Sequence, residues 1–222
     1  MQLGKSVLVD EAKKEYSGFL FVLEGIDGSG KTCACKELLK RLTSDGYDVI
    51  HLREPTNQSQ WGKEIRARSP KGELTPEEEL ELFIRDREWH IANRILPALK
   101  EGKVVLLDRY FFATGAYQST VTNLSWEDIL RRNREEISAP EPDIVFILDV
   151  PAKIGLERAT GRTGKANLQF EKLDRLVKVR QAYLEIAEND VGTFRIINAE
   201  QPLERMVDEI YDIITDTLIM TE

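Results

Sequence analysis

The stretch "GIDGSGKTCACKE", Gly25 to Glu37, decides the fold because it joins a glycine-rich turn to the start of a helix. Its spacing is one glycine, four further residues, and then Gly30, Lys31 and Thr32. In such a loop the backbone N–H groups wrap a phosphate, and the N-terminus of the next helix adds positive potential. The alternative is an ordinary surface glycine turn. A strand before the loop and a helix after it favour the phosphate loop.

The flanking sequence predicts both elements. "FLFVLEG", Phe19 to Gly25, is a short apolar run that ends at glycine, which is typical of a buried strand. From Lys31 to Asp45 the pattern is helical, and Gly46 ends it. Four further strands are predicted at Asp48–Leu52, Val104–Asp108, Asp143–Val150 and Phe194–Ala199.

Helical patterns separate these strands. The first is a long helix in Thr75–Gly102, with Thr75 as N-cap, Pro76 as first residue, and Pro97 as a kink or a break. The others are Trp126–Glu136, Ala152–Ala159, Phe170–Glu188 and Leu203–Met220. Strands that alternate with helices imply crossover units. The sequence therefore predicts an α/β three-layer sandwich with a five-stranded parallel sheet of the P-loop type, in a single domain over residues 1–222 with an N-terminal extension at 1–18.

Composition narrows the class of protein. The chain has 222 residues, of which 41% are hydrophobic and 32% charged, which is typical of a globular domain. A net charge of −8 argues against a dedicated nucleic-acid binder, although it allows a local basic cleft. The only cysteines, Cys33 and Cys35, lie two apart on a predicted helix and do not face each other. With no signal peptide and no membrane-spanning stretch, we expect a cytoplasmic protein without membrane or nucleic-acid partners.

The loop itself predicts the binding of nucleotide phosphates with magnesium. Lys31 is expected to reach the β- and γ-phosphates, and the Thr32 hydroxyl to ligate Mg²⁺. The backbone of the loop is expected to hold the ATP phosphates through Gly25, Ile26, Asp27, Gly28, Ser29 and Gly30.

A second motif, "VVLLDRY", ends a buried strand in an acid, where ligands bind in open α/β sheets. Asp108 is therefore a candidate for the magnesium shell or for orienting the acceptor, and Arg109 for binding phosphate through its planar fork. The alternative is a capping aspartate beside a solvated arginine. "REP", from Arg53, brings a second arginine to the same edge of the sheet.

A third segment, "LERATGRTGKANLQFE", is basic and rich in glycine. We expect a mobile lid at about residues 158–170, in which Arg158, Arg162 and Lys165 close over phosphates. Arg158 is a candidate ATP-binding residue and Arg162 a candidate catalytic residue. The alternative is an ordinary solvated loop.

Together these motifs make the resemblance specific. From about residue 19 to residue 218 the chain resembles the thymidylate kinase (dTMP kinase) family of nucleoside monophosphate kinases. The matching stretches are "FVLEGIDGSGKT", "REP", "LFIRDR", "GKVVLLDRYFFATGAYQ", "PDIVFILDVPAKIGLERA" and "INAEQPLE".

The resemblance implies a role for each matching residue. Asp27 lies near the acceptor's 3′-hydroxyl, Arg53 and Arg109 hold the acceptor phosphate, and Asp108 stands next to magnesium. Phe83 stacks on thymine, Arg87 hydrogen-bonds the base, and Tyr117 crowds the 2′ position of the sugar. Thr114 and Gln118 belong to the same acceptor site, and Arg162 resembles a lid arginine. The resemblance also implies a homodimer, formed through an apolar helical face near residues 80–99.

The expected activity is magnesium-dependent transfer of a phosphoryl group from ATP to dTMP. A kinase for another deoxynucleoside monophosphate, such as dUMP, stays open, as does a P-loop nucleotide-binding protein without this activity. A GTP-dependent switch is disfavoured because the chain lacks an Asn-Lys-x-Asp motif. A catalytically idle relative is disfavoured because both Lys31 and Asp108 are present.

Overall fold

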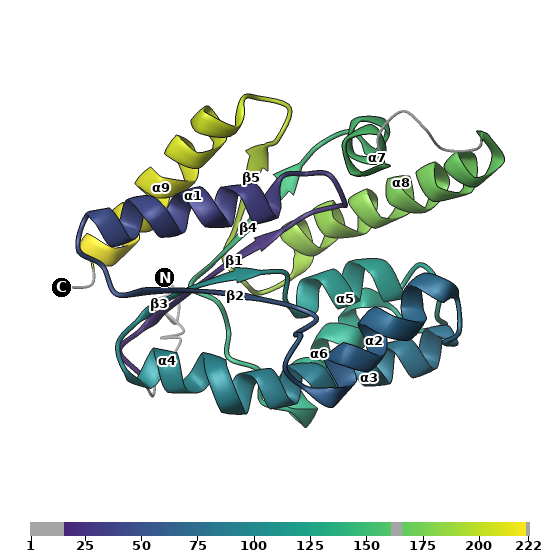
Figure 1. The fold of residues 1–222 in the computed structure, drawn as a ribbon, viewed down its shortest axis with the longest axis horizontal. Coiled ribbons are helices and arrows are strands. Elements are labelled where there is room, and N and C mark those ends of the chain that lie inside the picture. Colours follow the sequence, from purple (N-terminus) through teal and green to yellow (C-terminus); the bar gives the residue numbers. More distant parts are fainter. Residues whose placement is uncertain (1–15, 161–165, 221–222) are drawn as a thin grey trace, which may run out of the picture.

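Five parallel strands form one sheet at the centre of the molecule (Figure 1). The structure, a computed structural model, describes residues 16–160 and 166–220, with side chains of 166–171 excepted. The strand order is β2-β3-β1-β4-β5, and each neighbouring pair is parallel. The strands are β1 (Phe19–Glu24), β2 (Val49–Arg53), β3 (Val104–Asp108), β4 (Ile144–Asp149) and β5 (Phe194–Asn198).

The central strands are apolar along nearly their whole length because both faces of the sheet are covered. Every residue of β3 is buried, and β1 is buried from Leu20 onward. Near-continuous apolar runs are what a parallel sheet between two helical layers requires. The predicted α/β three-layer sandwich with a five-stranded parallel sheet is confirmed.

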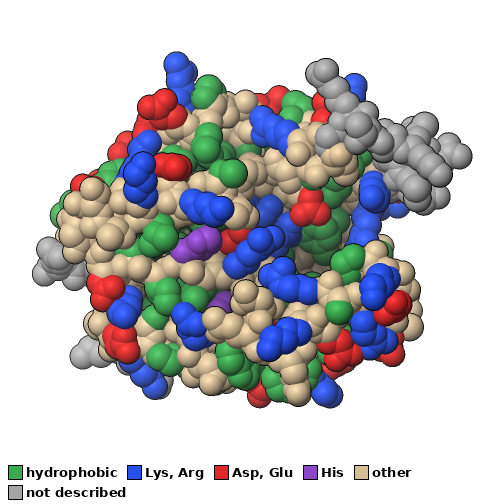
Figure 2. Space-filling model, viewed as in Figure 1, with side chains coloured by type: hydrophobic (Ala, Val, Ile, Leu, Met, Phe, Trp, Pro, Cys, Tyr) green, Lys and Arg blue, Asp and Glu red, His purple; other side chains and the backbone are tan. Residues whose placement is uncertain are grey.

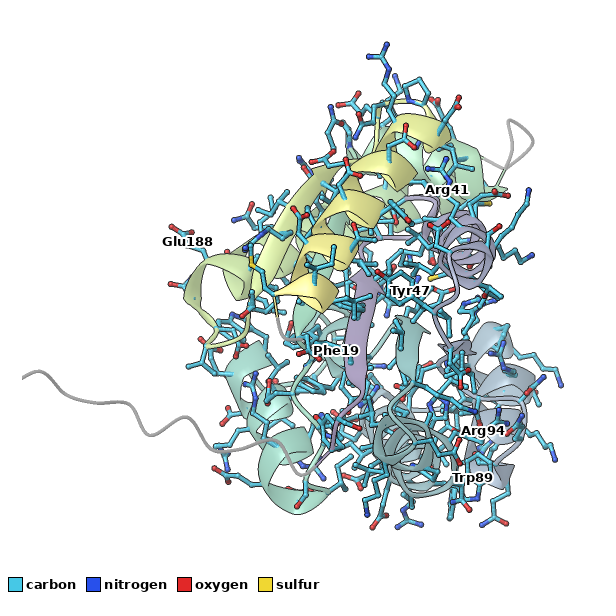
Figure 3. The ribbon with its side chains drawn as sticks, turned by 90° about the vertical axis from the view of Figure 1, so that its left-hand side faces the viewer. Phe19, Arg41, Tyr47, Trp89, Arg94 and Glu188 are labelled. Carbon is cyan, nitrogen blue, oxygen red and sulfur yellow. The ribbon has the colours of Figure 1, made fainter. Side chains whose placement is uncertain are left out.

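Helices cover the two faces in separate layers. Helices α1 (Lys31–Ser44) and α9 (Leu203–Ile219) lie side by side on one face, where Arg41 and Asp208 form an ion pair (Figures 1 and 3). The other layer contains α4 (Leu96–Lys100), α5 (Phe111–Gln118), α6 (Trp126–Glu136) and α8 (Ala166–Asn189). The remaining helices are α2 (Gln60–Arg68), α3 (Pro76–His90) and α7 (Ala152–Thr160). None of the described helices is long and apolar enough to cross a membrane.

Pro97 does not end the predicted long helix. The helix continues from α3 through a π-helical segment, Ile91–Ile95, into α4. Proline lacks an N–H and its ring crowds the carbonyl group four residues earlier. The wider π turn just before Pro97, closed by the Leu96 N–H on the Ile91 carbonyl oxygen, accommodates it. At the other end, Thr75 forms the predicted cap as a full capping box with Glu78.

Two α-helices in the described chain were not predicted from the sequence. In α2, Gly62 disfavours helix by propensity, but a Cβ there would lie 2.3 Å from the Thr56 carbonyl oxygen. The close approach of the two backbones therefore requires glycine. Helix α5 is short and buried on nearly all sides, so it shows no helical periodicity. A further correction concerns α8, which begins at Ala166 and not at Phe170.

The functional residues of the sheet meet where the strands end. In the register of the parallel pairs, Leu23 of β1 and Arg53 of β2 are both partners of Asp108 in β3. The glycine loop follows β1 directly. The carboxyl edge of the sheet, where ligands bind in open α/β folds, thus carries the glycine loop, "REP" and the acid that ends "VVLLD".

Candidate active site

The glycine loop between β1 and α1 is built on left-handed backbone. Gly25, Gly28 and Gly30 have φ values of 134°, 80° and 98°, which residues with a side chain rarely adopt. A Cβ on Gly28 would also lie 2.0 Å from the Gly155 carbonyl oxygen of α7. Gly30 precedes α1 without a capping side chain, so the first N–H groups of the helix remain available to an anion.

Lys31 lies inside this loop. Its ammonium group donates to the carbonyl oxygens of Gly25 and Ile26 at 2.9 and 2.8 Å and to Ser29 Oγ at 3.2 Å. Burial, followed by the nearby positive charge of Arg109, lowers the pKa of Lys31 to about 7. The loop therefore holds a buried amine at its centre, where a bound anion would favour its charged form.

Thr32 and Asp108 are hydrogen-bonded to each other beside Lys31. The Thr32 hydroxyl donates to Asp108 Oδ2 at 2.5 Å, and Arg53 Nε lies 3.7 Å from the same oxygen. Asp108 Oδ1 is buried and has no hydrogen-bond partner in the described part of the chain. A hydroxyl and a carboxylate with a spare oxygen fit Mg²⁺, which prefers oxygen and keeps water and phosphate ligands of its own. No group of three or more His, Cys, Asp or Glu side chains that could hold a metal occurs among the described residues.

Arg109 links the glycine loop to α5. Its Nη2 atom donates to Asp27 Oδ1 at 2.5 Å, and its guanidinium lies 5.2 Å from the centre of the Tyr117 ring. The Tyr117 hydroxyl accepts from the Asp27 N–H at 3.1 Å. Arg109 adopts a φ of 73°, a strained value for a side-chain-bearing residue, which is the kind of outlier that gathers at functional sites.

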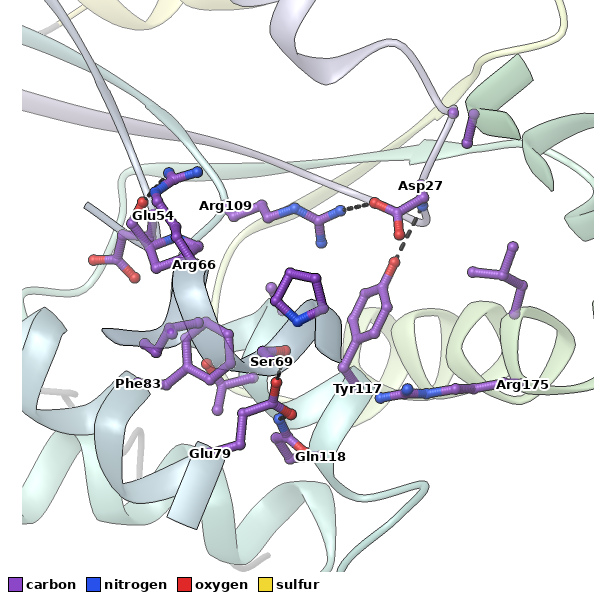
Figure 4. A pocket seen from close by; sticks show the side chains of 18 of the residues that line it. Asp27, Glu54, Arg66, Ser69, Glu79, Phe83, Arg109, Tyr117, Gln118 and Arg175 are labelled. Atoms are coloured by element: carbon purple, nitrogen blue, oxygen red, sulfur yellow. Dashed lines mark hydrogen bonds and ion pairs between the residues drawn. The ribbon is translucent and has the colours of Figure 1, made fainter. Parts of the chain in front are cut away.

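A cavity of about 740 Å³ opens beside this junction (Figure 4). Its size is that of a small-molecule site. Figure 2 shows Lys and Arg side chains gathered around the hollow at the centre of this face, although the chain is acidic overall. Of the acceptor-site candidates from the sequence, the cavity is lined by Asp27, Phe83, Arg87, Arg109, Thr114, Tyr117 and Gln118.

Two other candidates in the described residues lie outside the cavity wall. Arg53 does not line the cavity but lies at the carboxyl end of β2, with half of its side chain exposed. Arg158 lies on α7 and donates to the Ala199 carbonyl oxygen at 2.8 Å. The predicted lid at 158–170 is helical up to Thr160 and again from Ala166, and Arg162 and Lys165 lie outside the described residues.

Several residues of the site were not found from the sequence. Arg66 of α2 and Arg175 of α8 line the cavity, and both come from helical positions that carry no recognisable motif (Figure 4). Glu24 was also missed, although the loop motif begins next to it.

Glu24 of β1 accepts hydrogen bonds from the N-terminus of α5. It is fully buried and accepts from the backbone N–H groups of Tyr110 and Ala113 at 2.7 and 3.0 Å and from the Tyr183 hydroxyl at 2.9 Å. Burial raises the pKa of Glu24 to about 7. The carboxyl group thereby ties β1 to the turn that carries Arg109.

Comparison with known proteins agrees with this geometry. The family model described as "Thymidylate kinase" matches residues 23–210. A probable thymidylate kinase of Archaeoglobus fulgidus is 43% identical over 199 residues, which cover 90% of this chain and 96% of that relative. The thymidylate kinase of Xanthomonas euvesicatoria pv. vesicatoria is 37% identical over 90% of this chain and 85% of that relative. The thymidylate kinase of Desulfotalea psychrophila is 38% identical over 87% of this chain and 92% of that relative. The chain therefore belongs to the thymidylate kinase family of nucleotide-binding kinases.

Proposed function

We propose that this enzyme transfers the γ-phosphoryl group of ATP to dTMP, giving ADP and dTDP. The observation that carries the proposal is the junction at Asp27, a residue of the glycine loop that is bonded to both Arg109 and Tyr117 of the cavity wall. Asp27 thus belongs both to a loop that suits phosphates and to the wall of a cavity whose volume suits a nucleotide. The names of the relatives supply the acceptor.

On the donor side, the glycine loop and the N-terminus of α1 bind the ATP phosphates. Lys31 neutralises charge on the β- and γ-phosphates as the transition state forms. Thr32 and Asp108 hold Mg²⁺, which would neutralise and orient the phosphates when bound.

On the acceptor side, Arg53 and Arg109 hold the phosphate of dTMP. One of its oxygens forms a bond to the γ-phosphorus while the bond to the β–γ bridging oxygen breaks, and ADP leaves with that electron pair. The attacking phosphate is already ionised at neutral pH, so positioning and charge neutralisation do most of the catalysis.

The cavity can read the base and the sugar. Phe83 offers a flat apolar face for stacking, and Arg87 a donor for a base carbonyl. Gln118 donates from Nε2 to Glu79 at 2.7 Å, and its Oε1 is buried without a partner in the described chain, so it can accept from a base N–H. Tyr117, fixed by Asp27, crowds the 2′ position, and Thr114 completes the wall.

The lid is part of the same proposal. We infer that Arg162 approaches the γ-phosphoryl group when the lid closes and that Arg158 borders the ATP site. In support, the loop residues Gly25 to Gly30 include no basic side chain, so further positive charge must come from elsewhere.

We also propose a cytoplasmic homodimer consisting of one kinase domain per chain. The free thiols of Cys33 and Cys35 suit a reducing compartment. Support for the dimer face near residues 80–99 is limited to half-buried side chains such as Trp89 and Leu96, since the exposed large hydrophobic side chains among the described residues lie elsewhere. Light scattering after gel filtration should give twice the mass of 25.4 kDa.

The proposed reaction is tested by separating the products of ATP, Mg²⁺ and dTMP by ion-exchange chromatography. We expect dTDP and ADP in equal amounts, and loss of several orders of magnitude in rate for Lys31→Ala. Lys40→Ala, an exposed change on the same helix, serves as the matched control and should keep the wild-type rate. ADP without dTDP would make the protein an ATPase and reject the proposal.

A further inference from the structure

Arg87 is held by acceptors from three separate parts of the fold. Its Nε atom donates to Oε2 of Glu54, just after β2, at 2.8 Å, and its Nη2 atom forms an ion pair with the same oxygen at 2.7 Å. Nη2 also donates to Thr114 Oγ1 of α5 at 2.9 Å, and Nη1 donates to Asn133 Oδ1 of α6 at 2.6 Å. The ring of Tyr110 lies against the guanidinium, 5.5 Å from its centre. Arg87 is 1% exposed, so these contacts are made away from water.

These bonds engage three of the donors of Arg87. A guanidinium has five N–H groups in a fixed plane. Glu54, Thr114 and Asn133 each accept a hydrogen bond from one of them. Within the described residues two N–H groups remain, one on Nη1 and one on Nη2. Because Nη2 is also paired with Glu54 Oε2, the N–H on Nη1 is the donor left for a ligand in the cavity that Arg87 lines. The guanidinium cannot turn without breaking the three buried hydrogen bonds.

Asn133 fixes which way Nη1 points. Its Nδ2 donates to the Ile129 carbonyl oxygen, one turn earlier in α6, at 2.8 Å. A carbonyl oxygen only accepts, so the amide cannot flip, and Oδ1 must face Arg87. Asn133 is fully buried and does not itself line the cavity. It can therefore influence a ligand only through Arg87.

Glu54 is supported in a similar way. Its second oxygen, Oε1, lies 3.0 Å from Nδ1 of His90, which is 2% exposed. Removing Glu54 would leave the Arg87 charge buried and unpaired, which destabilises the fold as well as moving the side chain. Asn133 is uncharged and is therefore the better residue through which to test the arrangement.

We propose that Asn133, together with Glu54, is a positioning residue that aims the remaining N–H on Nη1 of Arg87 and so determines which pyrimidine the site accepts. The proposal rests on the proposed function and identifies the residues that set its preference among pyrimidines. Thymine and uracil carry a carbonyl oxygen at the position where cytosine carries an amino group. A donor whose direction is fixed forms a hydrogen bond with the carbonyl oxygen. The amino group of cytosine is itself a donor and cannot accept that hydrogen bond.

The test compares Asn133→Leu, which lacks the acceptor, with Asn133→Asp, which keeps an acceptor toward Arg87. Both variants lose the hydrogen bond to Ile129, so a merely structural role would affect both alike. The readout is the ratio of kcat/KM for dTMP to that for dCMP. We expect Asn133→Leu to lower this ratio by at least ~10-fold through the KM for dTMP, and Asn133→Asp to stay within about threefold of wild type. Glu135→Gln, an exposed change on α6, is the control.

A measurement on the wild-type protein covers the case in which Asn133→Leu does not fold. In the nitrogen-15 NMR spectrum of its arginine side chains, assigned with Arg87→Lys, the Nη protons of Arg87 should give separate signals because rotation is hindered. Adding dTMP should shift one of them, and dCMP should not. A folded Asn133→Leu with the wild-type ratio, or a single averaged Nη signal, would overturn the proposal. If wild type does not phosphorylate dTMP at all, the proposed function fails instead, while the NMR result still reports on Arg87.

Discussion

Lys31 should take up a proton when ATP binds. In the ligand-free protein, burial and the charge of Arg109 lower its pKa to about 7. The phosphates of ATP bring negative charge to the same place and favour the ammonium form, so the pKa of Lys31 rises in the complex. Near pH 8, a group with a pKa of about 7 is protonated in only ~0.1 of the molecules, so binding should take up ~0.9 proton. Near pH 6 the uptake should fall to ~0.1 proton, because the ammonium form already predominates.

Titration calorimetry in two buffers of different ionisation enthalpy measures this uptake. At the more alkaline pH the triphosphate itself is fully ionised, so the proton is assigned to the protein. Lys31→Met keeps the length of the side chain without the amine and should abolish the uptake, whereas Lys40→Met should retain it. No uptake by wild type near pH 8, or equal uptake by Lys31→Met, would refute the proposed role of this buried amine.

Three further changes test other parts of the structure. Burial raises the pKa of Glu24 to about 7, so the folded protein keeps a proton that the unfolded chain releases. The free energy of unfolding should therefore fall by up to ~3 kcal/mol between about pH 4.5 and pH 7, and Glu24→Gln should remove that fall in urea titrations. If the free energy of unfolding of Glu24→Gln falls with pH as it does in the wild type, the buried proton of Glu24 is not the cause. Gly28→Ala should lower both kcat/KM and Tm, because the added Cβ would lie 2.0 Å from the Gly155 carbonyl oxygen. A variant with wild-type kinetics would mean that the glycine loop and α7 can move apart without loss of activity. Arg87→Ala should lower kcat/KM for dTMP by at least ~10-fold and shrink the preference over dCMP, and an unchanged preference would remove Arg87 from base reading.

The elements that carry local signals could be predicted from the sequence. The run before Gly25, the acid that ends "VVLLD", and the capped start at Thr75 each contain the residues that form the structure. Their meeting at one edge followed from a single rule, that parallel strands end on the same side. Asp108 and Thr32 could thus be expected together, and they lie 2.5 Å apart.

The remaining parts depend on contacts between distant segments. Gly62 suits α2 only because Thr56 and Asp86 approach it, and neither neighbour is visible in the local pattern. Asn133 gives no sequence signal, because an asparagine in a helix usually faces solvent. Its bond to Arg87 spans 46 residues and exists only once α3 and α6 have packed. The resemblance therefore implies base reading by Arg87, whereas the groups that hold Arg87 are visible only in the folded structure.

The most direct test of dTMP phosphorylation is an ADP-release assay with ATP and Mg²⁺ across a panel of nucleoside monophosphates: dTMP, dUMP, dCMP, dAMP and dGMP. The cavity chemistry at Phe83, Arg87 and Gln118 predicts the highest kcat/KM with dTMP, a lower value with dUMP, and little release with the others. A higher kcat/KM with any other monophosphate, or no release above background with all five, would contradict it.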